Sequence, residues 1–168
     1  YEQALKLNPD DEEVHFNLGY ALAQHGDLTN AVAQYQKALK LFPDYVEAHN
    51  NLGNLYRRMQ RYDEALAEFS AALKLMPENP SALNNLGRAL GEQGKTAEAV
   101  TNFIAALKAD PDHPEARFNL GNSLLLQGRR KEARAEFAEL LRRHPDFKPA
   151  RAALDRLGPS EITPPLAP

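Results

Sequence analysis

One three-residue sequence, Asn-Leu-Gly, occurs four times in this chain at a constant interval of 34 residues. The copies end at Gly19, Gly53, Gly87 and Gly121, and prolines at positions 9, 43, 77, 111 and 145 keep the same interval. A fixed period of this length is typical of a protein built from stacked copies of one small unit, in which each unit contacts only its neighbours. The 168 residues therefore set the number of units and not the size of one central core.

Each unit contains two helical patterns separated by a short break. In the first full unit, Val14, Leu18 and Leu22 follow helical spacing. Gly26 interrupts the pattern, and a second amphipathic helix follows until Pro43, which cannot continue a helix. We therefore expect an all-α structure. Its expected segments are half a repeat at 1–11, full repeats at 12–45, 46–79, 80–113 and 114–147, a capping helix at 148–157 and a proline-rich disordered tail at 158–168.

A glycine recurs inside the first helix of every full repeat, where glycine costs roughly 1 kcal/mol relative to alanine. Its recurrence at one phase predicts a contact so close that a Cβ atom would not fit. We expect alanines of the second helices, at positions 31, 65, 99 and 133, to face these glycines. An aromatic residue follows each alanine by four positions, at Tyr35, Phe69, Phe103 and Phe137.

These positions together resemble the tetratricopeptide repeat family. The family pattern of Leu-Gly, alanine, aromatic, alanine and proline is matched here by Leu52-Gly53, Ala65, Phe69, Ala72 and Pro77, and the resemblance covers about residues 1–157. It implies a right-handed α-solenoid whose first helices line the concave surface, and a function in protein–protein interaction. Where many members carry tryptophan, the four repeats hold His15, His49, Leu83 and Arg117.

One asparagine stands directly before each Leu-Gly pair. These four residues, Asn17, Asn51, Asn85 and Asn119, are called the asparagine ladder below. Equivalent helices stack roughly 10 Å apart, and an extended peptide advances about 3.3 Å per residue, so the ladder would meet about every third residue. An asparagine amide offers both a donor and an acceptor, as a peptide group does. We therefore predict that the ladder binds peptide backbone, although internal duplication could also have copied a neutral asparagine.

The asparagine ladder is similar to the one that holds substrate peptides in the tetratricopeptide domain of O-linked N-acetylglucosamine transferase. Neighbouring side chains on the same helices would select among peptides, since the first-repeat end is aromatic and the middle is polar and basic. Leu125 and Leu126 make the last-repeat end apolar, but they could equally pack against the capping helix. The predicted contacts beyond the ladder are Phe16, Tyr20, Asn50, Asn54, Arg57, Asn84, Arg88, Phe118 and Asn122.

Nothing in the sequence predicts catalysis. Five histidines are present, but none lies in a metal-binding pair of the HExxH type, and we find no nucleophile with a nearby base. We expect no enzyme activity, no metal and no cofactor. The formal net charge of −3 argues against nucleic acid as a partner, and no apolar run is long enough for insertion into a membrane.

The expected partner is a protein or peptide bound in the groove of a cytoplasmic, non-catalytic adaptor or scaffold. The basic side chains with which some relatives bind chaperone C-termini are missing, so we predict no binding of that kind. Two other interpretations stay open. The array could form a homo-oligomer through its exposed ends, since residues 10–13 are acidic and residues 129–156 carry nine Lys or Arg against five Asp or Glu. It could also dock substrates for an enzyme in a missing part of the chain, because residues 1–8 match the second half of an earlier repeat.

Overall fold

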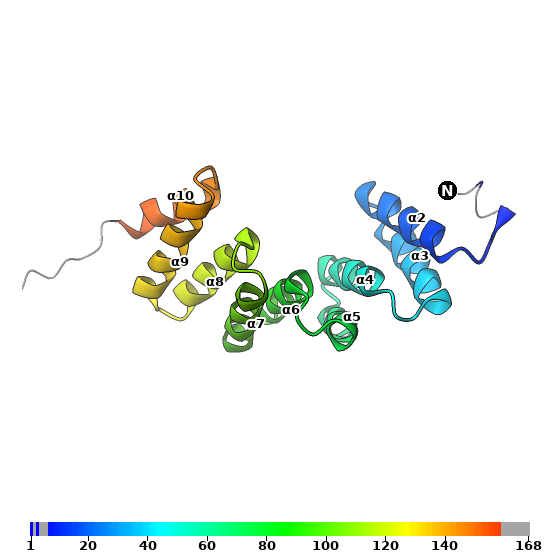
Figure 1. Cartoon of the computed structure of the whole chain (residues 1–168), viewed down its shortest axis with the longest axis horizontal. Helices are drawn as coiled ribbons and strands as arrows, with labels where there is room; N and C mark the ends of the chain where they lie inside the picture. The colour runs from blue at the N-terminus through cyan, green and yellow to red at the C-terminus, as the bar shows by residue number, and fades with distance from the viewer. Residues whose placement is uncertain (2, 4–6, 159–168) are drawn as a thin grey trace, which may run out of the picture.

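The computed structural model of the protein describes residues 1, 3 and 7–158, and every regular element in that part of the chain is an α-helix. The helices come in pairs that follow one another along the long axis of the molecule (Figure 1). The predicted all-α solenoid is confirmed. The helices are α2 (Glu12–Gln24), α3 (Leu28–Leu41), α4 (Val46–Arg58), α5 (Tyr62–Leu75), α6 (Pro80–Glu92), α7 (Thr96–Ala109), α8 (Pro114–Leu126), α9 (Arg130–Arg143) and α10 (Lys148–Leu157).

The two helices of each pair are joined by the same tight turn. After α4, the backbone N–H of Arg61 donates to the carbonyl of Tyr56 at 2.9 Å, and equivalent bonds close the turns after α2, α6 and α8. This turn needs one residue in the left-handed backbone region, which glycine occupies at the least cost. Gly26 and Gly94 have φ angles of 84° and 82°, and Gln60 takes the same conformation at 59°. The turn is therefore kept in the one repeat that lacks glycine at this position.

Polar residues set where several of the helices begin. Side-chain oxygens of Asp11 and Asn79 accept hydrogen bonds from the backbone N–H groups of Val14 and Ala82, both at 2.9 Å. Such N-caps satisfy backbone donors that have no partner inside the helix. Pro80 then takes the first position of α6, where its missing N–H costs nothing.

The recurring glycines lie against aromatic rings. A Cβ atom added at Gly53 would lie 2.7 Å from Cε1 of Phe69, and one added at Gly121 would lie 2.5 Å from Cε1 of Phe137. Both rings are fully buried. The predicted close contact is confirmed. The predicted opposing alanine is found only in the first repeat, where a Cβ atom at Gly19 would lie 3.3 Å from the carbonyl oxygen of Ala31, and at Gly53, Gly87 and Gly121 the nearest atoms belong to the aromatic ring. The aromatic residue four positions after each alanine fills the space in front of the glycine, because its ring reaches farther across the helix pair than a methyl group does.

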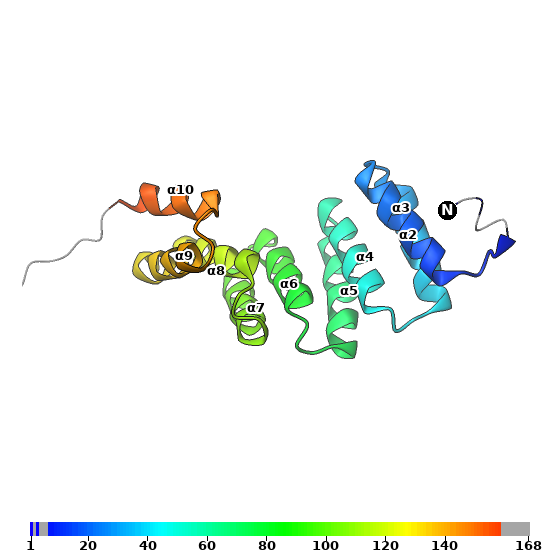
Figure 2. The ribbon, with the colours of Figure 1, turned by 45° about the horizontal axis from the view of Figure 1, so that its top comes forward.

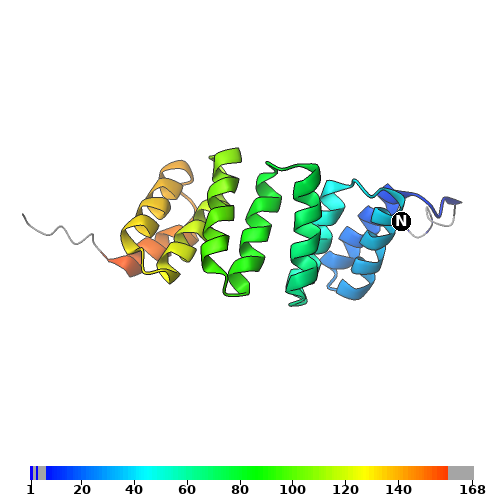
Figure 3. The same ribbon diagram turned by 90° about the horizontal axis from the view of Figure 1, so that it is seen from below.

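The first helices of consecutive pairs also contact each other directly, α2 with α4, α4 with α6 and α6 with α8. Figures 2 and 3 show that helices α2 to α7 lie across the long axis, one after another. In a curved array, the row of helices that come closest together is the inner row. We call α2, α4, α6 and α8 the inner row, and its exposed side is the concave face.

At the C-terminal end, α10 covers the last pair. Ala150 is fully buried, and a guanidinium nitrogen of Arg134 in α9 donates to the carbonyl of Leu157 at 3.1 Å. Beyond Gly158, the predicted proline-rich tail lies outside the described residues, as do positions 2 and 4–6 of the predicted half repeat. Among the helices of residues 7–158, none is long and apolar enough to cross a membrane.

Candidate functional site

Asparagine side chains of the inner row meet across consecutive repeats with an offset of 35 residues. Asn85 Nδ2 donates to Asn50 Oδ1 at 3.0 Å, which joins α6 to α4. Asn119 Nδ2 donates to Asn84 Oδ1 at 2.9 Å, which joins α8 to α6. Contact between repeats is therefore shifted by one residue from the sequence period. We call each such contact between first helices a joint.

The asparagine ladder is partly used by these joints. Asn85 is 9% exposed and its neighbour Asn84 is 5% exposed, whereas Asn17, Asn51 and Asn119 are half-buried. An asparagine amide can form up to four hydrogen bonds, and the joint uses only one of those of Asn119. The same bond holds the amide in one orientation. The half-buried members of the ladder thus keep amide groups on the concave face that can form further hydrogen bonds.

Asn51 has a different partner, the hydroxyl of Tyr35. Tyr35 takes the place that phenylalanine occupies in the other three repeats. Burial raises the pKa of Tyr35 to about 12, and the hydrogen bond with Asn51 offsets part of that rise. The phenol therefore stays protonated at neutral pH, and it can donate to or accept from the Asn51 amide.

Phe16 and Phe118, which were predicted to line the groove, belong largely to aromatic joints. Phe16 stacks on Tyr45 with ring centroids 4.7 Å apart, and the centroid of Phe118 lies 5.5 Å from that of Phe147. Tyr45 and Phe147 directly precede α4 and α10. Both phenylalanines are half-buried, so each ring presents only part of its surface to the groove. Aromatic joints thus lie at the two ends of the array and amide joints lie in its middle.

Four other predicted contacts occupy one equivalent position in the four inner helices, three residues after the ladder asparagine. Tyr20 is 53% exposed, whereas Asn54, Arg88 and Asn122 at the same phase are half-buried. Burial lowers the pKa of the Arg88 guanidinium, and the nearby positive charge of Arg57 lowers it further. The middle of the concave face is therefore polar and basic, as the sequence predicted.

Arg57 itself makes a polar contact between repeats. Its Nη1 lies 2.6 Å from Oε1 of Glu92, again 35 residues later, so this ion pair joins α4 to α6. The Arg57 side chain is only 14% exposed, and its Nε is buried without a hydrogen-bond partner in the described part of the chain. Arg57 is therefore held within a joint and is less available to a ligand than the sequence suggested.

Comparison with known families settles what kind of array this is. One family model, described as TPR repeat, matches residues 1–26, 19–60 and 53–94, and another, described as tetratricopeptide repeat, matches residues 84–146. The chain belongs to the tetratricopeptide repeat family. Members of this family generally act as protein-interaction modules. No curated protein sequence matches the chain.

Solved tetratricopeptide repeat structures have the same fold. MamA superposes with a TM-score of 0.79 at 22% identity, over 90% of this chain and 87% of that one. The pilF protein of Pseudomonas aeruginosa gives 0.81 at 25% identity, over 87% and 67% of the two chains. YrrB, described as a TPR protein with an unusual peptide-binding site, gives 0.74 at 28% identity, over 93% and 80%.

The position at which many tetratricopeptide repeats carry tryptophan forms a polar bridge in three of the four repeats here. His49 Nδ1 lies 2.6 Å from Oε2 of Glu68 in α5, and His49 Nε2 lies 2.9 Å from the carbonyl oxygen of Pro43. Leu83 has no polar atom with which to form such a bridge. Equivalent bridges join His15 to Gln34 and Pro9, and Arg117 to Glu136 and Pro111. Each bridge connects both helices of one tetratricopeptide repeat to the proline that ends the repeat before it.

Sequence analysis did not identify the partners in the joints, Tyr45, Phe147 and Glu92. A signal for the aromatic partners was present, however. Where the first helix has phenylalanine at position 16 or 118, the residue 29 positions later is aromatic. Where it has asparagine at position 50 or 84, the residue 29 positions later is Asn79 or His113. Comparing these two equivalent positions across the repeats would have distinguished the aromatic joints from the amide joints.

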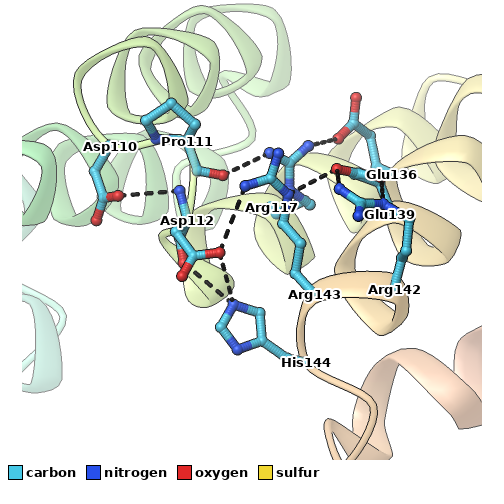
Figure 4. A network of polar contacts seen from close by, with 9 residues as sticks. All are labelled: Asp110, Pro111, Asp112, Arg117, Glu136, Glu139, Arg142, Arg143 and His144. Carbon is cyan, nitrogen blue, oxygen red and sulfur yellow. Dashed lines mark hydrogen bonds and ion pairs between the residues drawn. The ribbon is translucent and has the colours of Figure 1, made fainter.

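A further polar cluster connects the last two tetratricopeptide repeats (Figure 4). Asp112, just before α8, lies 3.5 Å from a guanidinium nitrogen of Arg143 and 3.3 Å from Nε2 of His144. Arg143 also pairs with Glu139, at 2.7 Å. Within the described residues, no three His, Cys, Asp or Glu side chains are grouped so that they could hold a metal ion. We assign this cluster a structural role between the α7–α8 loop and the C-terminal end of α9.

Proposed function

We propose that the concave face binds an extended segment of another protein, and that the asparagine ladder forms hydrogen bonds with the backbone of that segment. The observation that carries this proposal is the set of half-buried amides of Asn17, Asn51 and Asn119 at one phase of the inner row. Each residue of an extended segment presents one N–H and one C=O group, which an asparagine amide can match. Binding through backbone atoms would tolerate many side chains.

The joints support this proposal because they restrict how the amides can move. Asn119 is hydrogen-bonded to the buried side chain of Asn84, and Asn51 lies beside the hydroxyl of the buried Tyr35. A side chain that is already held in place loses less conformational entropy when a ligand binds. The ladder would then be similar to that of O-linked N-acetylglucosamine transferase, and the groove would serve the same end as the peptide-binding site in the description of YrrB.

Neighbouring side chains would decide which segments bind well. The exposed ring of Tyr20 and the exposed parts of Phe16 and Phe118 would favour apolar residues near the two ends of the groove. Asn54 would favour a polar residue near the middle of the groove, and Asn122 would favour one beside Phe118 on α8. In this proposal the array is a non-catalytic adaptor that needs no cofactor and holds its partner by non-covalent contacts alone.

The test removes two ladder amides that lie next to each other along the groove. Peptides selected from a random displayed library on the wild-type array serve as ligands, and their dissociation constants are measured on the double variant Asn51→Ala with Asn85→Ala. Loss of two backbone contacts is expected to weaken binding about tenfold or more. The thermal midpoint should move little, because the lost amides contribute only a few hydrogen bonds to folding.

Asn50→Ala is the matched control for this experiment. It breaks the same joint, because Asn50 accepts the hydrogen bond of Asn85 at 3.0 Å, but it leaves the ladder intact. Binding by Asn50→Ala should therefore weaken clearly less than binding by the double variant, because Asn50 is only one predicted contact beside the ladder and both ladder amides are kept. If the control weakens binding as much as the double variant does, the joint matters and the ladder does not. If the double variant loses stability and keeps its affinity, the asparagine ladder is structural.

A second candidate function is self-assembly through the ends of the array. The observation in its favour is that Tyr1 is 61% exposed and Leu7 is 90% exposed at the N-terminal end. Exposed apolar side chains near one end of a solenoid could contact the end of another copy. In that case the edges and not the groove would make the functional contacts, and the array would act as a scaffold.

A further inference from the structure

Arg88 lies in α6, near the middle of the concave face. Its side chain is half-buried, and no hydrogen bond or ion pair to it is formed by the described residues. A guanidinium carries five N–H donors and one permanent charge, so water and ligands are the available partners. Burying part of a charged group without a hydrogen-bond acceptor costs free energy, which a bound acceptor would offset.

The carboxylate best placed to pair with Arg88 is already used. Glu92 follows Arg88 by four residues on α6, the spacing at which helical side chains of opposite charge commonly pair. Its Oε1 instead accepts a hydrogen bond from Nη1 of Arg57 at 2.6 Å. Within the described residues, the ion pair between repeats therefore leaves Arg88 without a carboxylate partner.

The electrostatic surroundings of Arg88 favour an incoming negative charge. Burial lowers the pKa of its guanidinium, the charge of Arg57 lowers it as well, and Glu92 and Glu115 act in the opposite direction. The causes that disfavour the charged form outweigh the two carboxylates. An anion that approached Arg88 would relieve both the lost hydration and the repulsion from Arg57.

We propose that Arg88 binds the side-chain carboxylate of an aspartate or glutamate in the extended segment that occupies the groove. This inference rests on the proposed function, because the asparagine ladder would hold the backbone that presents this acidic residue. The planar fork of a guanidinium matches the two oxygens of a carboxylate in geometry as well as in charge. The array would thus prefer segments with one acidic residue at a fixed position. At the neighbouring positions the ladder would contact only the peptide backbone and would not select among side chains.

The experiment compares what the wild type and two variants select from a random peptide library. The peptides are displayed as N-terminal fusions, so that no free C-terminal carboxylate is present and every carboxylate comes from a side chain. The variants are Arg88→Gln and, as the control for lost charge, Arg58→Gln. Arg58 is an exposed arginine of α4 that donates to the carbonyl of Ala23 at 3.5 Å.

We expect peptides selected on the wild type and on Arg58→Gln to share an aspartate or glutamate at one position, and peptides selected on Arg88→Gln to lose that preference. For one selected peptide, replacing the acidic residue by its amide should weaken binding to the wild type about tenfold. The same replacement should leave binding to Arg88→Gln unchanged. Arg88→Lys should recover part of the loss, because lysine keeps the charge but not the fork.

The possible failures of this experiment are distinguishable. If the wild type selects peptides that have no acidic preference, the carboxylate proposal is overturned and the proposed peptide groove stands. If an acidic preference persists in Arg88→Gln, the assignment to Arg88 is wrong. If the wild type selects no peptide at all, both proposals fail. Circular dichroism of each variant shows that the array is folded in every arm.

Discussion

His49 lies between two hydrogen-bond acceptors, the carboxylate of Glu68 and the carbonyl of Pro43, at 2.6 Å and 2.9 Å. A neutral imidazole has one N–H group, so only the protonated ring can donate to both acceptors. The hydrogen bond with Glu68 raises the pKa of His49 above 6.5, and this effect exceeds the opposing effect of burial. The bond to Pro43 and the charge of Asp44 act in the same direction as Glu68.

This geometry predicts that stability depends on pH around neutrality. Because the folded-state pKa of His49 is raised, its contribution is fully present below pH 6.5 and is lost as the pH rises through the folded-state value. We expect the free energy of unfolding, measured in urea, to fall over this interval. In Glu68→Gln the fall should be smaller, because a glutamine amide can donate to a neutral ring and does not require its protonation.

The first repeat supplies a natural comparison for this prediction. His15 makes the same pair of contacts, but its partner in α3 is Gln34, at 2.7 Å. Titration of the His49 ring by NMR should therefore give a pKa above 6.5 in the wild type and a lower one in Glu68→Gln, in which the partner is a glutamine as it is for His15. Equal values in the two proteins, or a wild-type value at or below 6.5, would show that the bridge does not need the charged ring.

At the scale of helices, the joints divide the array into ends and middle. Phe16 packs against Tyr45 and against the buried Tyr35, whereas Asn50 meets the amide of Asn85. Removing an aromatic ring from a half-buried site costs about 2–4 kcal/mol, and removing one neutral hydrogen bond costs about 1 kcal/mol. We expect Phe16→Ala to reduce the free energy of unfolding in urea by clearly more than Asn50→Ala does.

A double-mutant cycle tests whether the amide joint is a real pair. If Asn50 and Asn85 stabilise each other, the double alanine variant should lose about as much stability as either single variant, with a coupling near 1 kcal/mol. Asn50→Ala combined with Asn119→Ala is the control, because these side chains belong to different joints. Strict additivity in the first cycle would mean that the hydrogen bond contributes nothing measurable.

The helices could be predicted from the sequence, but the residue pairing in the amide joints could not. Helical spacing, the breaks at Gly26 and Gly94 and the recurring prolines depend on local chemistry, which a single repeat already contains. The period alone places equivalent residues side by side, and so it predicted a ladder of equivalent asparagines. Consecutive repeats are rotated relative to each other, which shifts the contact by one residue and pairs Asn85 with Asn50. That rotation arises from packing between repeats and is not visible in any one of them.

At the scale of the whole molecule, the groove and the ends compete as the functional surface. The inner row joins its helices by polar contacts in the middle. The concave face there combines hydrogen-bonding groups with Arg88, which has no ion-pair partner among residues 7–158. The ends differ in charge, with acidic residues at 10–13 and an excess of Lys and Arg over 129–156. Attraction between such ends would be screened by salt, whereas apolar contacts through Leu7 would not.

Light scattering on the intact protein and on a variant that lacks residues 1–9 can decide between these surfaces. If the groove is the functional surface, the molar mass should be that of a single chain for the intact protein, and deletion should lower it only by the mass of the deleted residues. If the ends drive assembly, the intact protein should be larger than one chain and deletion should reduce it to one. Repeating the measurement at high salt identifies the cause, because an assembly held by opposite charges would then dissociate even with residues 1–9 present. If the protein has the mass of a single chain and binds the selected peptides with the same affinity before and after deletion, the functional surface is the groove, where the asparagine ladder and Arg88 lie.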